Sequence, residues 1–600
     1  MKVLNFAPFA HISQHEGATK VLVDSLLQTG AEVVTVRCNS ILSPGCLVLE
    51  SQSSLDEAKR DRICNECKLK AKLSGRKSDT LDLFLDDYLS ESDFQAIVNE
   101  TAEVSQADLM ERKFRGIPVA KYALYEFSLN LKLLPNEPTP DSHWDTYLRA
   151  YRAALVVACG MDRILKQEKP DRLMTYNSRY SANRVACWLS DQYEIPHFSI
   201  HSGSHHSKRY EQLTIERGIG ENYFLNRSNE WLARQRRPLT PSEMVSLRKH
   251  LDWTLKAKSY WTYSAPARMK LSSEVLKGLG ISTGKRFALA LMSSIDERAA
   301  WEYAKESEVS QGGALFADQW SWLAFLIKKY ESMPDQILVI RPHPREFPNK
   351  REQVTSQAAQ LIKQLADTTS AKNIIFNFPQ DGLSLYDLMK SSAFILNSSS
   401  SAGLEAVLFG KYVLGNGDVI TAYPPEIHKQ PRDVSEYSLL IDQAESEISS
   451  FLELRLAYRW LSFVTRGYPV NISRYFNWRP LSQMLQRHAR NQVIYAAKKR
   501  ENRFLAASAR NLANAIFDLL TRRKRRIDKR TSRLLTSKVL GEPQPVSAPI
   551  DIEPITHRLL LETFLLTIEF RHWTKLLGIN RKANFLENYK LVSGEAMDLE

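Results

Sequence analysis

Two short segments carry residues that could bind an anion. In RPHPRE (341–346), prolines on both sides of His343 restrict the backbone, so the imidazole is held in one direction. In NSSSSAGLEAVLFGK (397–411), four serine hydroxyls precede a predicted helix, whose free N–H groups and macrodipole favour negative charge. Each segment directly follows an apolar, strand-like run. Because ligands of open α/β sheets bind at the carboxyl ends of strands, we expect Arg341, His343 and the serines to form one site.

The serine segment also has a simpler interpretation. One serine with a glutamate further on can cap a helix without any ligand. Four consecutive hydroxyls exceed that need, so we favour a ligand that contacts Ser399, Ser400 and Ser401. Gly403 would then allow close approach of the backbone. A carboxylate at Glu405 suits a ribose diol better than a phosphate, because it repels anions.

Three further segments are expected to face the same cleft. The strand RFALALMSS opens into SIDER, which adds Ser294 and Asp296. The first strand of the chain ends in AHISQHEGATK, where His15 or Glu16 could act as a general base. A helix-capping carboxylate is an equally good interpretation of Glu16. The loop HSGSHHSKR carries His201, His205 and Arg209, and we expect it to bind a polar substrate rather than a metal, since it has no carboxylate.

The cysteines leave two alternatives open. Four of the six are clustered, as Cys38, Cys46, Cys64 and Cys67, and the last two form a C-x2-C pair. Such a cluster could hold structural zinc or an iron–sulfur cluster. The first pair is too widely spaced for a knuckle, so free thiols in a reducing compartment are the alternative.

The elements that must position these residues alternate between strands and helices. A β-loop-α-β start at 2–38 predicts parallel pairing, and the alternation restarts at RFALALMSS. We therefore predict an α/β protein with two Rossmann-like domains facing a cleft and a mainly helical C-terminal extension. The predicted domains are residues 1–270 with a helical insertion, 271–485 with closing helices, and 486–600. GLGISTGKR (278–286) is not a phosphate-binding loop, because it lacks the required glycine and hydroxyl and precedes its strand.

Charge is concentrated in one part of the chain. Residues 487–538 hold 16 Lys and Arg against 3 Asp and Glu, which accounts for the whole net charge of +13. RRKRR (522–526) ends an amphipathic helical pattern, which favours binding to an anionic membrane surface; a solvated helix is the alternative. No nucleic-acid reading motif accompanies it. The N-terminus lacks a signal-peptide pattern and no segment is apolar enough to span a bilayer, so we expect a cytoplasmic protein, peripheral to the inner face of the cytoplasmic membrane.

The strand ending in RPHP, followed by SLYDLMKSSAFILNSSSSAGLEAVLFGKYVL, resembles the second domain of bacterial capsule polysaccharide glycosyltransferases. The resemblance covers about 285–420 well and 1–270 loosely. It implies a GT-B enzyme in which His343, Pro344 and the serines Ser399–Ser401 bind the nucleotide and phosphates of a sugar donor. Glu405 matches the acidic residue of the G-x-E-A pattern.

The expected function is a metal-independent transfer of a sugar from a CMP-, UDP- or similar nucleotide to a glycan acceptor of the cell surface. Preorganised donors would offset the charge that grows on the leaving phosphate. Two alternatives stay open. One is a polyol-phosphate transferase that uses CDP-glycerol. The other is a non-catalytic Rossmann-like scaffold tethered to a membrane.

Overall fold

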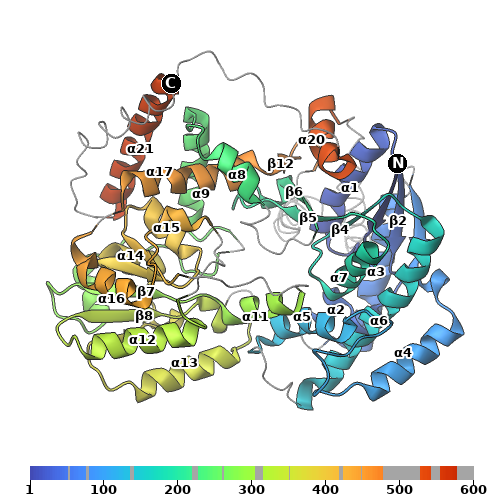
Figure 1. The fold of residues 1–600 in the computed structure, drawn as a ribbon, viewed down its shortest axis with the longest axis horizontal. Helices are drawn as coiled ribbons and strands as arrows, with labels where there is room; N and C mark the ends of the chain where they lie inside the picture. Colours follow the sequence, from blue (N-terminus) through green and yellow to red (C-terminus); the bar gives the residue numbers. More distant parts are fainter. Residues whose placement is uncertain are drawn as a thin grey trace, which may run out of the picture.

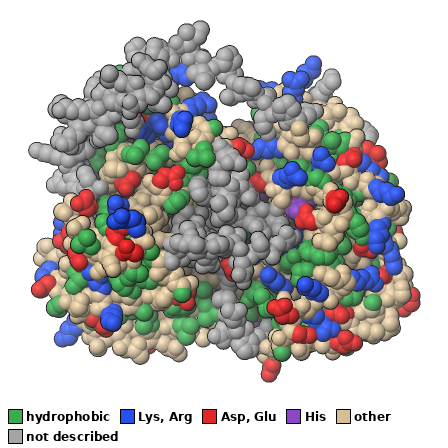
Figure 2. Space-filling view, in the orientation of Figure 1, with side chains coloured by type: hydrophobic (Ala, Val, Ile, Leu, Met, Phe, Trp, Pro, Cys, Tyr) green, Lys and Arg blue, Asp and Glu red, His purple; other side chains and the backbone are tan. Residues whose placement is uncertain are grey.

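The computed structural model describes residues 1–600 except 52–54, 76–79, 135–140, 219–226, 260–261, 305–314, 350–351, 418–422, 448, 477–526, 542–554 and 578–600. The basic run 522–526 and most of 487–538 therefore lie outside the described residues. On the face shown in Figure 2, acidic and basic side chains are interspersed over both halves of the molecule. This mixing agrees with the expectation that charge is balanced outside 487–538.

The first domain is built on a seven-stranded sheet in the order β12-β6-β5-β4-β1-β2-β3 (Figure 1). Its strands are β1 (Lys2–Phe6), β2 (Glu32–Arg37), β3 (Leu81–Phe84), β4 (Arg172–Tyr176), β5 (His197–Ser202), β6 (Gln212–Arg217) and β12 (Val470–Asn471). The strands β1 to β5 pair in parallel, and β6 is antiparallel to both β5 and β12. Runs such as VVTV in β2 are apolar without alternation because helices cover both faces of the sheet.

Two helical layers enclose this sheet. On one face, apolar residues of α5 (Val119–Leu131), α6 (Asp141–Glu168) and α7 (Ser181–Gln192) form a core with β1 and β2. On the other face, α1 (Ser13–Gln28) packs with α20 (Lys529–Leu540). The outer helices α2 (Leu47–Glu50), α3 (Glu57–Gly75) and α4 (Glu91–Glu103) complete the domain.

The second domain has a five-stranded, fully parallel sheet in the order β11-β10-β7-β8-β9. Its strands are β7 (Phe287–Leu291), β8 (Ile337–Arg341), β9 (Ile374–Phe376), β10 (Phe394–Asn397) and β11 (Val413–Gly415). One face packs against α12 (Gln319–Glu331), α13 (Gln357–Thr368) and α16 (Val434–Gln443). The other face packs against α10 (Ser272–Gly278), α14 (Leu385–Ser391), α15 (Ala402–Leu408) and α17 (Phe451–Ser462).

Both sheets have the strand order 3-2-1-4-5 of a Rossmann fold, so each has a point where the order reverses. These switch points lie between β1 and β4 in the first sheet and between β7 and β10 in the second. The predicted α/β class with two Rossmann-like domains and helical C-terminal elements is confirmed. In such sheets the switch point is where ligands bind.

The two domains are joined side by side along α5 and α11 (Ile295–Ala304), which lie next to each other in Figure 1. Nζ of Lys132 donates to the carbonyl of Val354 at 2.9 Å, and Nη2 of Arg345 donates to the carbonyl of Leu129 at 3.1 Å. Lys132 also pairs with Glu352 at 3.3 Å. Because a buried charge needs a partner at close range and these partners come from different domains, the contacts favour one orientation of the two domains.

After the second sheet the chain returns to the first domain. The helices α8 (Ser228–Arg234) and α9 (Pro241–Leu255) lie in the chain between the two sheets. Helix α17 leads into β12, which pairs with β6 at the edge of the first sheet. Residues 470–471 therefore belong to the first sheet, although they fall within the predicted second domain. The helix α21 (Ile555–Leu577) then packs on the second domain, where Arg459 of α17 forms a buried ion pair with Glu562. In the described part of the chain, no helix is both long and apolar enough to cross a membrane.

Several elements differ from the prediction. Residues 81–84 form β3 inside the helical insertion that we predicted for the first domain, and β6 and β12 were not predicted. β3 and β12 are the edge strands and β6 is the antiparallel strand next to β12, and the short or mixed patterns of such strands come from pairing rather than from periodicity. Helix α1 begins at Ser13, before Gly17, so His15 and Glu16 lie inside its first turn and not in the loop before it.

Candidate functional site

A cavity of about 120 Å³, here called the interdomain cavity, lies at the switch point of the second sheet. Leu291 and Met292 line it from the end of β7, and a loop residue of the first domain, His206, lines it from the opposite side. Six of the predicted donor-site residues are brought together there, namely Arg341, His343, Pro344, Ser400, Ser401 and Glu405. Ser294, Asp296, Ser399 and Gly403 do not line it.

His343 is held in one orientation and one tautomer. The backbone N–H of Arg345 donates to Nδ1 of His343 at 3.3 Å, which leaves the proton on Nε2. Burial, together with the charges of Arg345 and Lys132, lowers the pKa of His343 to about 3. The ring is therefore a neutral imidazole with one N–H to donate, which suits a phosphate oxygen.

The guanidinium group of Arg341 donates hydrogen bonds to oxygen atoms of the protein itself. Its Nη1 donates to the side-chain oxygen of Asn377 at 2.5 Å and to the carbonyl of Phe378 at 2.8 Å. Burial lowers the pKa of Arg341 to about 10, so the guanidinium remains charged. Carbonyl oxygens do not neutralise that charge. Arg341 therefore contributes a positive field to the cavity.

The four serines have four different environments. Oγ of Ser398 accepts from Nδ2 of Asn416 at 3.2 Å, and Oγ of Ser400 accepts from the N–H of Ala402 at 3.4 Å. Ser401 is exposed and caps nothing with its side chain. Ser399 adopts a positive φ of 57° and its hydroxyl is buried. Capping therefore accounts for one serine only, and the cavity has the hydroxyls of Ser400 and Ser401.

Gly403 serves a different purpose from the one predicted. A Cβ at this position would lie 2.2 Å from Oη of Tyr423 and 2.4 Å from Nδ2 of Asn397. The glycine therefore allows these side chains, and not a ligand, to approach the backbone. Helix α15 has only seven residues, so we assign anion binding to His343 and the hydroxyls rather than to its dipole.

Glu405 lines the cavity next to Tyr386, with which it forms a hydrogen bond. Burial raises the pKa of its carboxyl group to about 7. The group is consequently close to half protonated at neutral pH. In this state it can donate or accept a hydrogen bond, which suits a diol.

Ser294 and Asp296 act through a neighbour. The carboxylate of Asp296 binds Arg345 at 2.9 and 3.0 Å, and Ser294 hydrogen-bonds to Asp296. Arg345 is the residue whose N–H orients His343. We therefore correct the prediction that these two side chains contact the donor. Asp296 binds Arg345 of the RPHPRE segment, Ser294 binds Asp296, and neither lines the cavity.

Sequence reasoning missed the part of the cavity that comes from the linker between the domains. Thr262, Tyr263 and Ser264 line it, and the ring of Tyr263 lies edge-on to His343, with centroids 5.8 Å apart. The hydroxyl of Thr262 is buried and finds no hydrogen-bond partner among the described residues. No motif marks this segment. Its place after the last helix of the first domain was the only signal.

Of the two predicted bases, Glu16 is engaged elsewhere. Arg37 donates to both of its oxygens, at 2.8 and 2.9 Å, inside the first domain. The pKa of Glu16 is lowered because the attraction of Arg37 exceeds the effect of burial. An ion-paired carboxylate of lowered pKa is a weak base, and it does not cap α1 either, so neither interpretation of Glu16 holds.

His15 lies at the switch point of the first sheet. Its ring stacks on Tyr176 at the end of β4, with ring centroids 3.9 Å apart. His201 also stacks on Tyr176, with ring centroids 5.7 Å apart. Burial and the charge of Arg209 lower the pKa of His15 to about 3. His15, His201 and Arg209 thus form one group at the strand ends of the first domain.

His205 is separate from that group. Its ring lies edge-on to His250 of α9, with centroids 5.1 Å apart, and burial lowers its pKa to about 4. The adjacent His206 is the histidine of this loop that reaches the interdomain cavity, and its Nδ1 hydrogen-bonds with Thr254 at 2.9 Å. Of the two adjacent histidines, His206 lines the interdomain cavity and the predicted residue His205 does not.

The four clustered cysteines surround a second cavity instead of a single point. Within the described ranges, no three His, Cys, Asp or Glu side chains converge in a way that could hold a metal ion. Burial raises the pKa of Cys38 and Cys46 to about 12, which favours protonated thiols over the thiolates that bind zinc. Cys159 and Cys187 are buried core residues.

Comparisons with known proteins give only distant structural likeness. No family model and no curated protein matches the chain. A UDP-GlcNAc 2-epimerase from Neisseria meningitidis, solved bound to UDP-GlcNAc, superposes with a TM-score of 0.23 and 14% identity over 78% of this chain and 98% of its own. The Methanocaldococcus jannaschii UDP-GlcNAc 2-epimerase gives 0.24 and 10%, over 81% and 99%. A spinosyn rhamnosyltransferase complexed with spinosyn aglycone gives 0.22 and 10%, over 81% and 100%. With TM-scores this low, the resemblance decides neither the family nor the activity of this chain.

Proposed function

We propose that the protein is a glycosyltransferase that takes a sugar from a nucleotide donor held in the interdomain cavity. The observation that carries this proposal is the meeting of His343 with Ser400, Ser401 and Glu405 at the switch point of the second sheet. A nucleotide sugar offers a diphosphate for the imidazole N–H and the hydroxyls. It also offers a ribose diol for Glu405.

The neutral N–H of His343 and the field of Arg341 would offset negative charge on the departing phosphate. Both are fixed before the reaction by hydrogen bonds to the backbone, so they need no reorganisation when charge develops. We propose that these groups suffice without a metal ion. Pro344 keeps the turn after His343 rigid.

The acceptor would approach from the first domain, where His15, His201 and Arg209 gather. We retain His15 as the proposed base and remove Glu16, because Arg37 holds both oxygens of that carboxylate. The lowered pKa keeps His15 neutral but makes it a weak base, so we propose that the negative charge of a bound donor raises this pKa before His15 takes the acceptor proton. Replacing His15 with Phe, which preserves the stack on Tyr176, should lower kcat and leave donor binding intact.

A thermal-shift screen with CMP, CDP, UDP and GDP tests the proposal directly. We expect at least one diphosphate to raise the melting temperature of the wild-type protein but not of His343→Ala. His572→Ala, in an exposed position on α21, is the matched control and should keep the shift. If no nucleotide shifts the wild-type protein, the proposal fails. A product in which an altered sugar stays on its nucleotide would indicate an epimerase instead.

The finer assignment rests on the sequence resemblance. We propose a capsule or other surface polysaccharide as the acceptor, in the cytoplasm. Transfer from CDP-glycerol is the alternative donor chemistry, and the mass of the product separates the two. A scaffold without activity would be indicated if His343→Ala and Glu405→Ala left polysaccharide production unchanged.

Association with the inner membrane surface gains one structural support. On α21, Leu561, Phe564 and Ile568 are 41%, 61% and 40% exposed, and the same stripe continues to Arg571 and Lys575. Exposed apolar residues followed by cations suit an anionic bilayer surface. Replacing the three apolar residues with Ser should abolish sedimentation with phosphatidylglycerol vesicles, whereas Leu439→Ser on α16 should not.

A further inference from the structure

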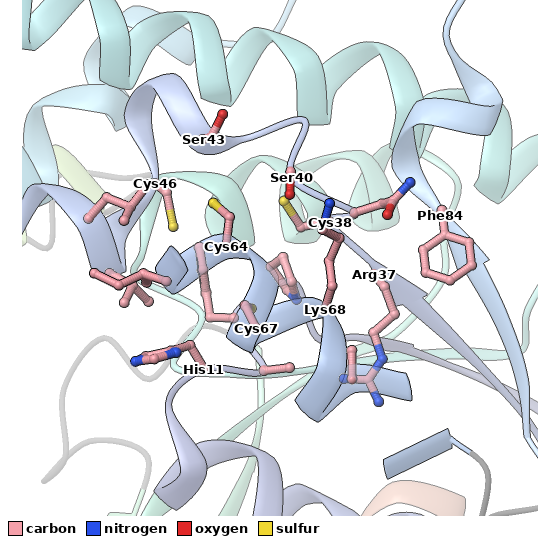
Figure 3. A pocket seen from close by; sticks show the side chains of 18 of the residues that line it. His11, Arg37, Cys38, Ser40, Ser43, Cys46, Cys64, Cys67, Lys68 and Phe84 are labelled. Atoms are coloured by element: carbon pink, nitrogen blue, oxygen red, sulfur yellow. The ribbon is translucent and has the colours of Figure 1, made fainter. Parts of the chain in front are cut away.

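A second cavity lies in the first domain and is not used by the proposed transfer (Figure 3). We call it the thiol cavity, because Cys38, Cys46, Cys64 and Cys67 all line it. Its volume is about 220 Å³. It lies over the carboxyl ends of β1 and β2, which is where ligands of α/β domains bind, and α3 forms its cover.

The wall of the thiol cavity is apolar. Phe9, Val48, Leu49, Ile63 and Ala71 contribute carbon surface from three separate segments. Figure 3 shows the sulfur atoms of Cys46 and Cys64 directed toward each other. Buried, protonated thiols behave as small apolar groups, so Cys38 and Cys46 extend this wall instead of forming an anionic site.

Positive charge is present where α3 meets solvent. Lys68 and Lys72 line the thiol cavity and are exposed, one turn apart on that helix. Among the described residues, no carboxylate pairs with either lysine. Arg37 and Asp82 also line the cavity. Glu16 forms an ion pair with Arg37, and burial raises the pKa of the Asp82 carboxyl group, which disfavours its anionic form. The cavity therefore combines an apolar interior with two uncompensated cations at its rim.

We propose that the thiol cavity binds an anionic amphiphile, with an alkyl or similar apolar group inside and a carboxylate or phosphate at Lys68 and Lys72. The volume is below the roughly 300–1,000 Å³ of sites that enclose a drug-sized ligand, so the anionic head lies outside the cavity, at the lysines. Nucleotides and sugars lack the alkyl chain that such an interior would take. The site therefore goes beyond the proposed transfer and assigns a second class of ligand to the protein.

Calorimetric titration of the full chain with octanoate, octyl phosphate, octanol and butyrate tests this proposal. We expect octanoate or octyl phosphate to bind at least tenfold more tightly than octanol and butyrate. The tighter of the two anions identifies a fatty-acid or a lipid-phosphate source.

Bound ligand should also slow alkylation of Cys64 and Cys67 by N-ethylmaleimide, measured by mass spectrometry. Equal affinity for octanol would overturn the assigned head group, and no binding with no protection would overturn the site.

Variants on α3 separate the two halves of the site. Lys68→Gln with Lys72→Gln should weaken binding of the anions about tenfold, whereas Lys59→Gln with Arg62→Gln, two charges of the same helix that do not line the cavity, should not. Ala71→Leu should block the interior, and Ile63→Trp serves the same purpose if that variant fails to fold. His343→Ala should still bind octanoate, so failure of the proposed transfer and failure of this site are distinguishable.

Discussion

The N–H of Arg345 donates to Nδ1 of His343, and this single contact decides what the histidine can do. With Nδ1 used as an acceptor, the imidazole presents one N–H at Nε2 and no charge at neutral pH. The ion pair between Arg345 and Asp296 holds the donor of that contact in place. Asp296, which we predicted to contact the donor, thus acts on His343 only through Arg345.

His343→Ala should weaken nucleotide-diphosphate binding by roughly ten- to a hundredfold, as expected for loss of a hydrogen bond to a charged group worth about 1.5–3 kcal/mol. Asp296→Asn should have a smaller effect in the same direction, because it loosens Arg345. Calorimetric titration measures both. Unchanged affinity in His343→Ala, with a folded protein by circular dichroism, would contradict the site.

Binding of a nucleotide sugar should weaken as the pH rises from 6 to 8. Glu405 has a pKa of about 7, so its carboxyl group changes from mostly neutral to mostly anionic over this range and repels the diphosphate. UDP-N-acetylglucosamine is a suitable probe because its phosphates do not titrate there. In Glu405→Gln the affinity should become independent of pH. An unaltered pH profile in that variant would show that another group titrates.

Glu16→Gln should destabilise the protein by about 3–5 kcal/mol, because it leaves Arg37 buried with no opposite charge. Replacing both residues with Leu should restore much of that loss. Urea unfolding measures the stability, and turnover of the folded fraction should stay near the wild-type level. A large loss of turnover in a stable Glu16→Gln variant would instead restore Glu16 as the base.

Glu126→Gln should stabilise the protein more at pH 8 than at pH 5. Burial raises the folded-state pKa of Glu126 to about 7, from an ordinary 4.5. Its stabilising contribution is therefore complete below pH 4.5 and is lost as the pH rises to 7, at about 1.4 kcal/mol per pH unit. Gln keeps the acceptor for the N–H of Ser181 and removes the titration. Glu103→Gln, at an exposed position, is the control and should show no such difference.

Gly403→Ala should destabilise the protein by about 1–3 kcal/mol, since the added methyl group would overlap Tyr423 and Asn397. Gly467→Ala is the matched control, because the nearest atom to its added Cβ lies 3.7 Å away. The shift in melting temperature compares the two. If Gly403→Ala melts normally but no longer binds nucleotide, the glycine contacts the ligand after all.

Local pattern was sufficient for the central strands and the main helices. Buried parallel strands contain uninterrupted apolar runs, such as 287–291 and 394–396, and α6 and α7 have clear helical periodicity. The edge strands β3 and β12 could not be predicted, because they depend on partners distant in the chain. The same distinction holds for side chains: position after a strand correctly gathered His343, Ser400, Ser401 and Glu405 at one cavity.

By itself, the sequence determined the α/β class, the two Rossmann-like units and which strand ends carry the proposed ligand-binding groups, because apolar runs and the alternation of strands and helices along the chain are local properties. Only the tertiary structure decided how each group is used. It paired Glu16 with Arg37, placed Asp296 behind Arg345, brought Thr262 and His206 to the cavity, and spread four cysteines around an apolar space. A side chain's partners come from elements far apart in the chain, and the partners set its charge, its tautomer and its exposure.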